Sequence, residues 1–255
     1  VLLFLMGIGP LLSWNYTSQS VLLNRFKLPL SISFLSGLGY IIFSSLFQLY
    51  VFVAIMGVSF TLSSILGEFY KSFKKQKNSS NFLHSIVKMF LSNRHKNGGY
   101  IVHIGIVLLF IGFIGRAFEV EKEFSLSPGE QIYFSNYVFK LNSIKSEARD
   151  NHYAFLSEID VVDSSTNQLL TNLKPEKRIY FYWNSDPEKR QPHSELDIYS
   201  TIQKDIYSIF SGYDAQKNIG YFKIMINPLV NWVWIGGVLM VIGSLFAFWP
   251  SRRNS

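Results

Sequence analysis

Histidine is the main candidate for chemistry in this 255-residue chain, because other common signatures of reactive sites are missing from its sequence. The chain has no cysteine, which excludes disulfides, thiolate nucleophiles and cysteine-ligated metals. It has neither a phosphate-binding glycine loop with its lysine nor a His-Glu-x-x-His pair, so these nucleotide and zinc motifs are also excluded. Its five histidines are His84, His95, His103, His152 and His193.

His103 differs from the other histidines because it lies inside an uncharged apolar stretch, residues 97–115. An ionisable group inside a membrane segment is costly, and it is therefore a functional candidate. Neutral imidazole is also an axial ligand for haem iron. The local residues leave two interpretations open: a haem ligand, or a histidine that bonds a neighbouring helix or reaches the membrane interface. One histidine supplies one axial ligand, so a second ligand would come from elsewhere.

Three glycines flank His103 at intervals of seven residues: Gly98, Gly105 and Gly112. On a helix this spacing predicts a smooth stripe of small residues. Such a stripe lets another helix, or a flat macrocycle, approach closely.

The other four histidines are interpreted mainly as polar surface residues. His84 and His95 fall in a basic loop, where solvation is expected and contact with lipid headgroups is the alternative. His152 follows Asp150 and Asn151 at an expected turn, so we predict a surface position. His193 lies in a polar loop, and the sequence does not define its role.

The charges that surround these residues are distributed in blocks, which indicates a membrane protein with a water-soluble insert. Residues 28–67, 97–115 and 224–251 carry no charge, whereas residues 116–223 carry 13 Lys/Arg and 16 Asp/Glu. A membrane span needs about 20 apolar residues. We therefore predict two spans in 28–67 with a turn near Gln48, a third from about Tyr100 to Gly115, and a fourth from about Leu229 to Trp249. The apolar residues 1–14 are too few for a complete span, and we interpret Val1 as an internal position of a longer protein.

The predicted fold class is an α-helical polytopic membrane protein with about four complete spans, a truncated N-terminal span and one small extracytoplasmic β domain. The predicted domains are residues 1–115 with a basic cytoplasmic loop at 69–96, the β domain at 116–223, and the last helix and tail at 224–255. Short segments rich in Tyr, Phe, Val and Ile, separated by turn clusters, predict a barrel or sandwich in the insert. The strand candidates are Glu121–Leu126, Gln131–Phe134, Tyr137–Ile144, His152–Val162, Gln168–Leu173 and Tyr221–Ile226, while Asp205–Phe210 is read as either a helical turn or a strand.

The basic residues outside the insert predict the orientation. Residues outside 116–223 include 11 Lys/Arg and one acid, Glu68. The basic residues fall in a loop with Arg25 and Lys27, in the loop 69–96, and in a tail with Arg252 and Arg253. Four spans place all three patches on one face, which is cytoplasmic by the positive-inside rule. The excess of positive charge therefore indicates topology rather than binding to nucleic acid. Within the loop, the apolar residues from Phe82 to Leu91 have helical spacing, and either a surface helix or packing under the bundle would account for them.

Six collinear segments carry a family resemblance: LMGIGPLLSW at 5–14, NGGYIVHIGIVLLFIGFIG at 97–115, LSPGEQIYF at 126–134, LKPEKRIYF at 173–181, SELDIYSTIQKDIY at 194–207 and INPLVNWVWIGGVLMVIGS at 226–244. Together they resemble the C-terminal region of CcmF, the cytochrome c-type biogenesis haem lyase subunit, a relative of CcmC and CcsA.

This resemblance implies a function in cytochrome c maturation. The family attaches haem covalently to the Cys-x-x-Cys-His motif of apocytochrome c, on the extracytoplasmic face, and receives haem from a haem chaperone. It also holds a b-type haem inside the membrane. His103 matches the family's histidine in the Gly-Gly-Tyr-x-Val-His-x-Gly segment, which implies that it is one axial ligand of that haem iron. The implied location is the bacterial inner membrane, with the β domain on the periplasmic side.

Parts of the family pattern are missing from this chain. The tryptophan-rich segment that cradles the incoming haem, its two flanking histidines and the second b-haem ligand are absent. We therefore expect the chain not to be competent for ligation alone, and expect as partners an N-terminal part or a split partner chain, apocytochrome c, the haem chaperone and other maturation subunits. The alternative function is a non-enzymatic transporter or scaffold subunit with an extracytoplasmic docking domain. Pro10 and Pro29 are expected near span ends and no charge lies at a span's centre, so no pathway for polar solutes is evident.

Overall fold

The chain forms two compact units. The computed structural model describes residues 1–12, 19–44, 47–74, 87, 89–91, 93–181 and 192–249. One unit comprises Val1–Ala117 and Leu229–Ser255 and is called the membrane unit below. The other, Phe118–Pro228, is called the β unit. It ends later than the predicted residue 223, because the last strand continues to pair as far as Pro228.

The membrane unit is helical. Four of its described helices are long and apolar enough to cross a membrane, by length and composition, which confirms the predicted four complete spans. A shorter apolar segment, Leu2–Leu11, precedes them. The helices are α1 (Leu2–Ile8), η1 (Gly9–Leu11), α2 (Gln19–Phe43), α3 (Leu49–Lys74), α5 (Arg94–Gly115), η2 (Arg116–Phe118) and α6 (Val230–Phe248).

The helices extend further into the basic segments than the sequence suggested. Arg25 and Lys27, expected in a loop, lie within α2, and Pro29, expected near a span end, lies inside the same helix. Lysine and arginine are good helix formers, so the backbone hydrogen bonds continue beyond the apolar stretch. In the same way α5 begins at Arg94, where the side chain of Asn93 caps the helix by accepting from the Lys96 amide at 3.2 Å.

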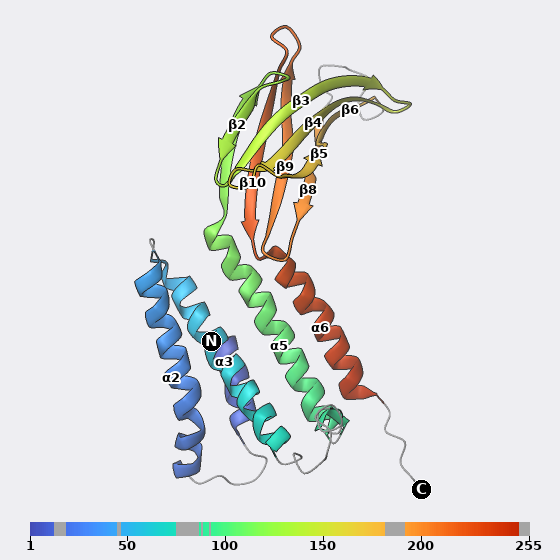
Figure 1. Ribbon diagram of the computed structural model, residues 1–255. Helices are drawn as coiled ribbons and strands as arrows, with labels where there is room; N and C mark the ends of the chain where they lie inside the picture. The colour runs from blue at the N-terminus through green and yellow to red at the C-terminus, as the bar shows by residue number, and fades with distance from the viewer. Residues whose placement is uncertain are drawn as a thin grey trace. The chain divides into compact units, whose positions relative to one another are not determined.

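Helix α5 packs closely along α6 over the predicted glycine stripe (Figure 1). A Cβ atom added at Gly105 would lie 2.7 Å from the carbonyl oxygen of Gly236, and one at Gly98 would lie 2.6 Å from Cβ of Ala247. At Gly112 an added Cβ would lie 2.4 Å from a methyl of Val233. The sequence predicted that either a helix or a macrocycle packs against the glycine stripe. In the structure, helix α6 packs there.

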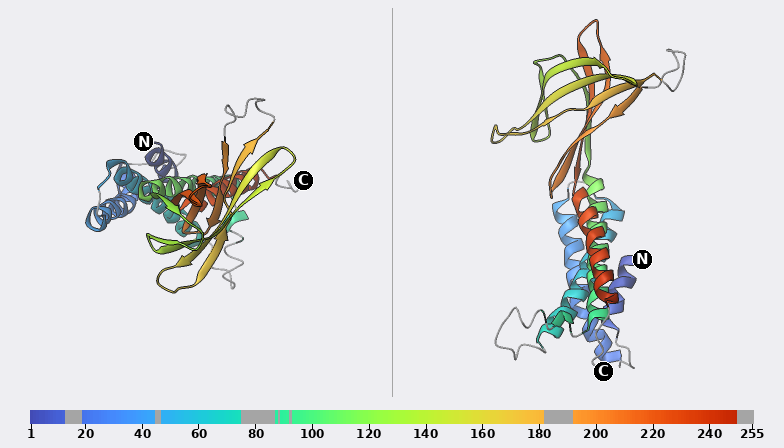
Figure 2. Two further views of the ribbon diagram at one scale, coloured as in Figure 1. Left: turned by 90° about the horizontal axis from the view of Figure 1, so that it is seen from above. Right: turned by 90° about the vertical axis from the view of Figure 1, so that its right-hand side faces the viewer.

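The other contacts of the membrane unit centre on α3, which lies beside α2 and also contacts α1 and α5 (Figure 2). Two buried hydroxyls fasten it: Ser33 of α2 donates to the Met56 carbonyl at 2.8 Å, and Thr61 donates to the Leu3 carbonyl at 2.6 Å. Hydrogen bonds of this kind replace the water that a membrane interior lacks. They hold α1, α2 and α3 together as one support for α5.

The β unit contains two antiparallel sheets. One has the strand order β1-β10-β9-β8, and the other has β2-β3-β4-β6-β7 with β5 also paired to β4. All six predicted strands are present, and the ambiguous segment 205–210 belongs to strand β9. The strands are β1 (Val120–Leu126), β2 (Gln131–Phe134), β3 (Tyr137–Ala148), β4 (His152–Asp163), β5 (Leu169–Leu173), β6 (Glu176–Tyr180), β7 (Pro192–Glu195), β8 (Asp197–Ser200), β9 (Lys204–Asp214) and β10 (Ile219–Pro228).

Both sheets contribute to one apolar core. Phe139 and Ile159 from one sheet and Phe210 and Phe222 from the other are almost fully buried. The rings of Phe210 and Phe222 stack with their centroids 4.9 Å apart. Burial of such side chains is the main stabilising contribution to a two-sheet domain, so this core gives the β unit an interior of its own.

Two tight turns fix the strand register. Gly129, in the predicted Ser-Pro-Gly-Glu turn, has φ of 92°, a conformation that a residue with a Cβ rarely adopts. Asp163 ends β4, and its Oδ1 accepts hydrogen bonds from the hydroxyl and amide of Ser165 and from the amide of Thr166. These bonds, led by the Ser165 hydroxyl, hold the pKa of the Asp163 carboxyl below its usual value.

We expect replacement of Gly105 by leucine to destabilise the membrane unit by about 1–3 kcal/mol, because a side chain there would press into the backbone of α6. The measurement is the thermal unfolding of the detergent-purified protein. Gly237→Leu is the matched control on α6, since an added Cβ at Gly237 would meet no atom within 4 Å. An equal loss of stability in both variants would contradict this account of the packing.

The Asp163 turn should loosen in acid. Because its pKa is lower in the folded chain than in the unfolded chain, the carboxylate stabilises the turn above its ordinary pKa, about 4. That stabilisation is lost as the pH falls through the lowered pKa. Hydrogen exchange of the Ser165 and Thr166 amides, corrected for intrinsic rates, should be slower in the wild type than in Asp163→Ala at about pH 6, and the difference should vanish in strong acid. A difference that persists at low pH would exclude the charged form as its source.

Candidate functional site

His103 lies on the face of α5 opposite the one that packs on α6. Two residues along a helix differ in direction by about 200°, so His103 and Gly105 face opposite sides. One turn before His103, the Tyr100 ring contacts the Phe69 ring of α3 at 5.4 Å between centroids. One turn after it, Val107 is completely buried in a cluster with Leu3 and Val58. His103 is therefore on the side of α5 that faces α3 and α1.

The imidazole of His103 is partly buried, and its Nδ1 atom has no hydrogen-bond partner among the residues that the structure describes. A buried polar atom left without a partner costs about 1–3 kcal/mol. In proteins such an atom calls for an explanation, and a ligand is one of the recognised ones. Among the described residues this nitrogen bonds no neighbouring helix, and the role of His103 as a haem ligand stays a prediction.

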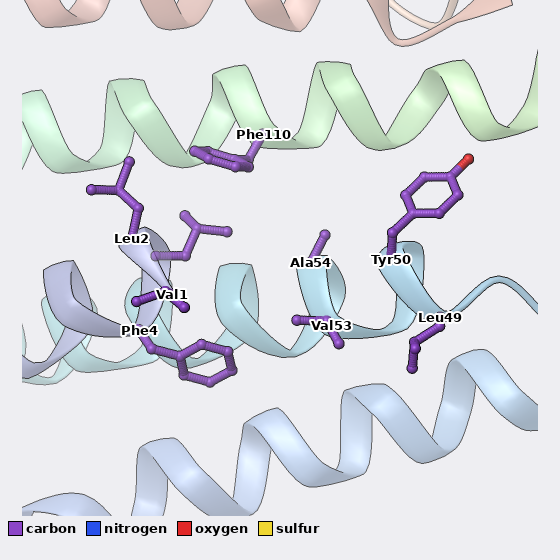
Figure 3. Close-up of a pocket in the computed structure, with 9 residues that line it drawn as sticks. Val1, Leu2, Phe4, Leu49, Tyr50, Val53, Ala54 and Phe110 are labelled. Carbon is purple, nitrogen blue, oxygen red and sulfur yellow. The ribbon is translucent and has the colours of Figure 1, made fainter.

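The face of α5 that carries His103 leads to an apolar pocket. Phe110, seven residues further on and about 10 Å along the helix axis, lines a pocket of about 470 Å³ together with residues of α1 and α3 (Figure 3). The lining is apolar apart from the Tyr50 hydroxyl and the backbone. It does not include His103, so the histidine and the pocket occupy successive levels of one helix face.

Charged residues lie at the other end of the same helix face. Glu68 of α3 accepts hydrogen bonds from Lys71 at 2.9 Å and from Lys96 of α5 at 3.3 Å. The Lys96 ammonium also lies 5.4 Å from the centre of the Tyr100 ring. Asn97, buried beside them, donates through its side-chain amide to the carbonyls of Met89 and Phe90. These contacts fix the first two turns of α5, on which the position of His103 depends.

This arrangement suits a single axial ligand rather than a metal centre made by this chain alone. Among the described residues, no group of three or more His, Cys, Asp or Glu side chains could hold a metal ion. A haem iron is held by one or two axial side chains and needs an apolar surrounding for its ring. His103, with Val107 and Phe110 beyond it, meets the first requirement on one side and contributes to the second.

Two of the other histidines are exposed, but they lie on a helix and a strand and not in the loops that the sequence predicted. His95 is exposed in the first turn of α5, and His193 is exposed on β7, its ring 5.8 Å from the Tyr180 ring. His84 lies outside the described residues, as does most of the apolar helical pattern that begins at Phe82.

The surface position predicted for His152 is wrong. His152 begins β4, is 7% exposed and lies opposite Tyr180 of β6, with 5.0 Å between the ring centroids. Its Nδ1 is 2.6 Å from the Asn151 side-chain oxygen. The expected turn at Asp150-Asn151 is present, but the strand pairing that follows covers the histidine. Since β6 was not among the predicted strands, its cover could not be foreseen.

The Pro-Glu-Lys-Arg segment at 175–178 is a structural centre of the β unit. The Glu176 carboxylate accepts from Arg178 at 2.8 Å and from Arg149 at 3.3 Å. The Pro175 carbonyl accepts from the buried hydroxyl of Ser157 at 2.8 Å. Lys177, whose pKa is lowered by burial, donates to Ser194 at 2.9 Å. The segment thus connects β6 to neighbouring strands and turns. These structural contacts explain its charged residues without a catalytic role.

Comparison with known proteins gives consistent matches. The family model "CcmF C-terminal beta-sandwich" matches residues 117–228. The cytochrome c-type biogenesis protein CcmF of Haemophilus influenzae is 23% identical over 249 residues, which is 97% of this chain and 36% of that protein. CcmF of Pseudomonas aeruginosa is 25% identical over 151 residues, 59% of this chain and 22% of that protein. The chain thus spans little more than a third of the length of the first relative.

A solved structure has the same fold. The protein described as cytochrome c heme lyase CcmF superimposes with a TM-score of 0.71 at 20% sequence identity, over 97% of this chain and 38% of that one. The similarity therefore includes the helices as well as the β unit.

We expect Glu176→Gln to destabilise the β unit by about 1–3 kcal/mol, because it removes the charge from a carboxylate that is only 16% exposed and bonded to two arginines. Denaturant-dependent hydrogen exchange of the peptides that span β4 and β6 would measure the change. Glu195→Gln is the control, since Glu195 is 48% exposed and, among the described residues, pairs with Arg178 alone at 3.3 Å, a contact worth less than about 1 kcal/mol. Equal effects of the two variants would refute the central role of Glu176.

Proposed function

We propose that this chain, which corresponds to the C-terminal region of CcmF, serves in cytochrome c maturation as part of a membrane haem lyase that attaches haem covalently to apocytochrome c. Support comes from the family match to the β unit and from the collinear similarity that extends over both units. The observation that carries the site is the buried Nδ1 of His103, which lacks a partner on a helix face lined by apolar residues.

The proposed role of His103 is to donate one axial ligand to an intramembrane b-type haem. A b-type haem, when bound, supplies a one-electron carrier within the membrane. The imidazole offers a nitrogen lone pair to the iron in its neutral form. The apolar neighbours Val107 and Phe110 would keep water from the ring edge on this side.

Three sets of contacts fix the position of α5 and therefore of His103. Its glycine stripe locks against α6, so the helix cannot rotate without driving α6 away. Tyr100 and Val107 hold the opposite face against α3. The contacts of Glu68 with Lys96 limit sliding of α5 along α3. A ligand on a rigid helix needs little reorganisation when it binds its metal.

The chain is proposed to act with other polypeptide segments. A second axial ligand, and the surface that cradles the incoming haem, would come from outside these 255 residues, either from an N-terminal part of the same protein or from a separate chain. The haem chaperone, apocytochrome c and further maturation subunits are the remaining proposed partners. Haem attachment by this chain without them is not expected.

The proposed location is a bacterial inner membrane, with the β unit on the periplasmic side. The basic residues support this orientation. Arg25 and Lys27 lie in the first turns of α2, Lys71 and Lys74 in the last turns of α3, and Lys96 in the first turn of α5. Successive spans alternate in direction, so all these ends fall on one membrane face, and that face is cytoplasmic by the positive-inside rule. Residues 118–228, inserted between α5 and α6, then fall on the other side.

His103→Ala in the complete protein should abolish or strongly reduce the b-type signal in a reduced-minus-oxidised visible spectrum, because the iron loses an axial ligand. The matched control is His95→Ala, which removes an exposed histidine two turns away on the same helix. Cytochrome c maturation should fall with the signal. A normal haem content in His103→Ala would refute the ligand assignment, and a wild-type protein without colour would favour the scaffold or transporter role.

A further inference from the structure

A second pocket of the membrane unit lies among η1, α2 and α3, and its lining differs in kind from the apolar pocket near Phe110. It has a volume of about 430 Å³ and contains two cations, Arg25 and Lys71, together with Gly67 and two hydroxyl side chains. Apolar residues of η1 and α2 complete the wall. We propose that this pocket binds an anionic phospholipid, with the headgroup phosphate between Arg25 and Lys71 and the acyl chains along the apolar wall.

The first argument is charge balance. The sequence of the membrane unit contains one acidic residue, Glu68. Lys71 and Lys96 share that carboxylate, so the local charge remains positive even where the ion pairs are made. Among the described residues, Arg25 donates from its NH1 to the Leu11 carbonyl at 3.0 Å. A guanidinium has five N–H donors, so this bond occupies one donor of Arg25 and an anion could accept from the others.

The second argument is depth. Arg25 is in the second turn of α2 and Lys71 in the last turn of α3, so both lie at the basic ends of membrane-spanning helices. Lipid phosphates lie at this level of a bilayer, and basic pockets between spanning helices are recognised sites for anionic headgroups. The Arg25 side chain is also tied back to η1, which positions the guanidinium inside the pocket rather than in the surrounding headgroup layer.

The third argument is that the pocket is amphipathic. Val21 and Leu28 at its rim are 44% and 62% exposed, whereas Leu11 and Pro29 are buried. Exposed apolar residues beside two cations suit a ligand with both a charged group and a hydrocarbon chain. A free phosphate ion would use the cations alone. The apolar wall therefore favours a lipid over inorganic phosphate.

Gly67 leaves room for the headgroup. A Cβ atom added there would meet no heavy atom within 4 Å, although Gly67 is itself partly buried. The neighbouring hydroxyls of Ser63 and Ser64 donate to carbonyls of their own helix, at 2.7 and 2.8 Å. Their donors are therefore occupied. The two cations, the side-chain amide of Asn24 and the open space at Gly67 are left as the recognition elements.

The test is native mass spectrometry of the protein purified from its membrane in mild detergent and supplied with phosphatidylglycerol, phosphatidylcholine or inorganic phosphate. Wild type should retain phosphatidylglycerol in preference to phosphatidylcholine. The double variant Arg25→Gln with Lys71→Gln should retain it about 30-fold less well, from the usual contribution of two basic residues. Gly67→Leu, which fills the pocket and leaves every charge in place, should also lose it.

Two controls separate a defined pocket from general attraction to a basic surface. Lys27→Gln with Lys74→Gln removes the same charge from the same two helices but from residues outside the pocket lining, and it should retain phosphatidylglycerol. Gly39→Leu adds the same side chain at an open position of α2 outside the pocket, and this variant should also retain phosphatidylglycerol. Equal loss in the charge-matched control, retention in Gly67→Leu, or equal binding of inorganic phosphate would each overturn the proposal. None of these outcomes depends on the haem content of the protein.

Discussion

The close approach of α5 and α6 is the constraint on which the membrane unit depends. Helices in a membrane are already surrounded by apolar lipid, so the hydrophobic effect does not drive them together. Their association relies on van der Waals contact and on hydrogen bonds between them. The glycines at 98, 105 and 112 on α5, with Gly236 and Gly243 on α6, bring the two backbones together. Because this contact occupies one side of α5, the opposite side is left for α3, and His103 lies on that side. Without the stripe, the direction in which His103 points would not be defined.

A single residue, Leu229, joins the last strand of the β unit to the last helix of the membrane unit. Strand β10 ends at Pro228 and helix α6 begins at Val230, so the change from extended to helical backbone is made at Leu229. Leu229 has φ of 63°, a left-handed conformation that costs a residue with a Cβ about 1–2 kcal/mol. Its carbonyl accepts from the Trp232 amide at 3.1 Å and closes the first turn of α6. The Asn-Pro-Leu-Val segment, first noted for its family resemblance, is thus the sequence of a strand-to-helix junction.

Much of this fold could be predicted from the sequence, and the exceptions have physical reasons. Spans follow from long uncharged runs, and the strands β1 to β5 and β10 follow from short apolar runs between turn residues. Strands β6, β7 and β8 were not foreseen. In β6, Glu176, Lys177 and Arg178 form ion pairs and hydrogen bonds that a hydrophobic pattern does not reveal. The burial of His152 depends on β6 and was missed for that reason. Helix α2 begins at Gln19 and helix α5 at Arg94, several residues before the spans predicted from residue 28 and from about Tyr100. Charge marks the membrane boundary but does not end a helix.

The sequence identified His103 as the candidate residue, but it did not reveal which side chains surround it. A single ionisable group in an apolar run indicates that His103 is unusual, yet the sequence cannot say whether a neighbouring helix satisfies it. The structure bears on this through the other buried polar residues of the membrane unit. Ser33, Thr61, Ser64 and Asn97 all donate to a backbone carbonyl.

Two buried polar side-chain atoms in the described part of the membrane unit have no such partner, Oε1 of Gln48 and Nδ1 of His103. Gln48 lies in the connection between α2 and α3, directly before the first residue of α3. His103 lies within a span, where no water replaces the missing bond. The described membrane unit therefore pairs its buried serine, threonine and asparagine side chains with backbone carbonyls but leaves the Nδ1 of His103 unpaired, and this difference is the reason for proposing His103 as a ligand.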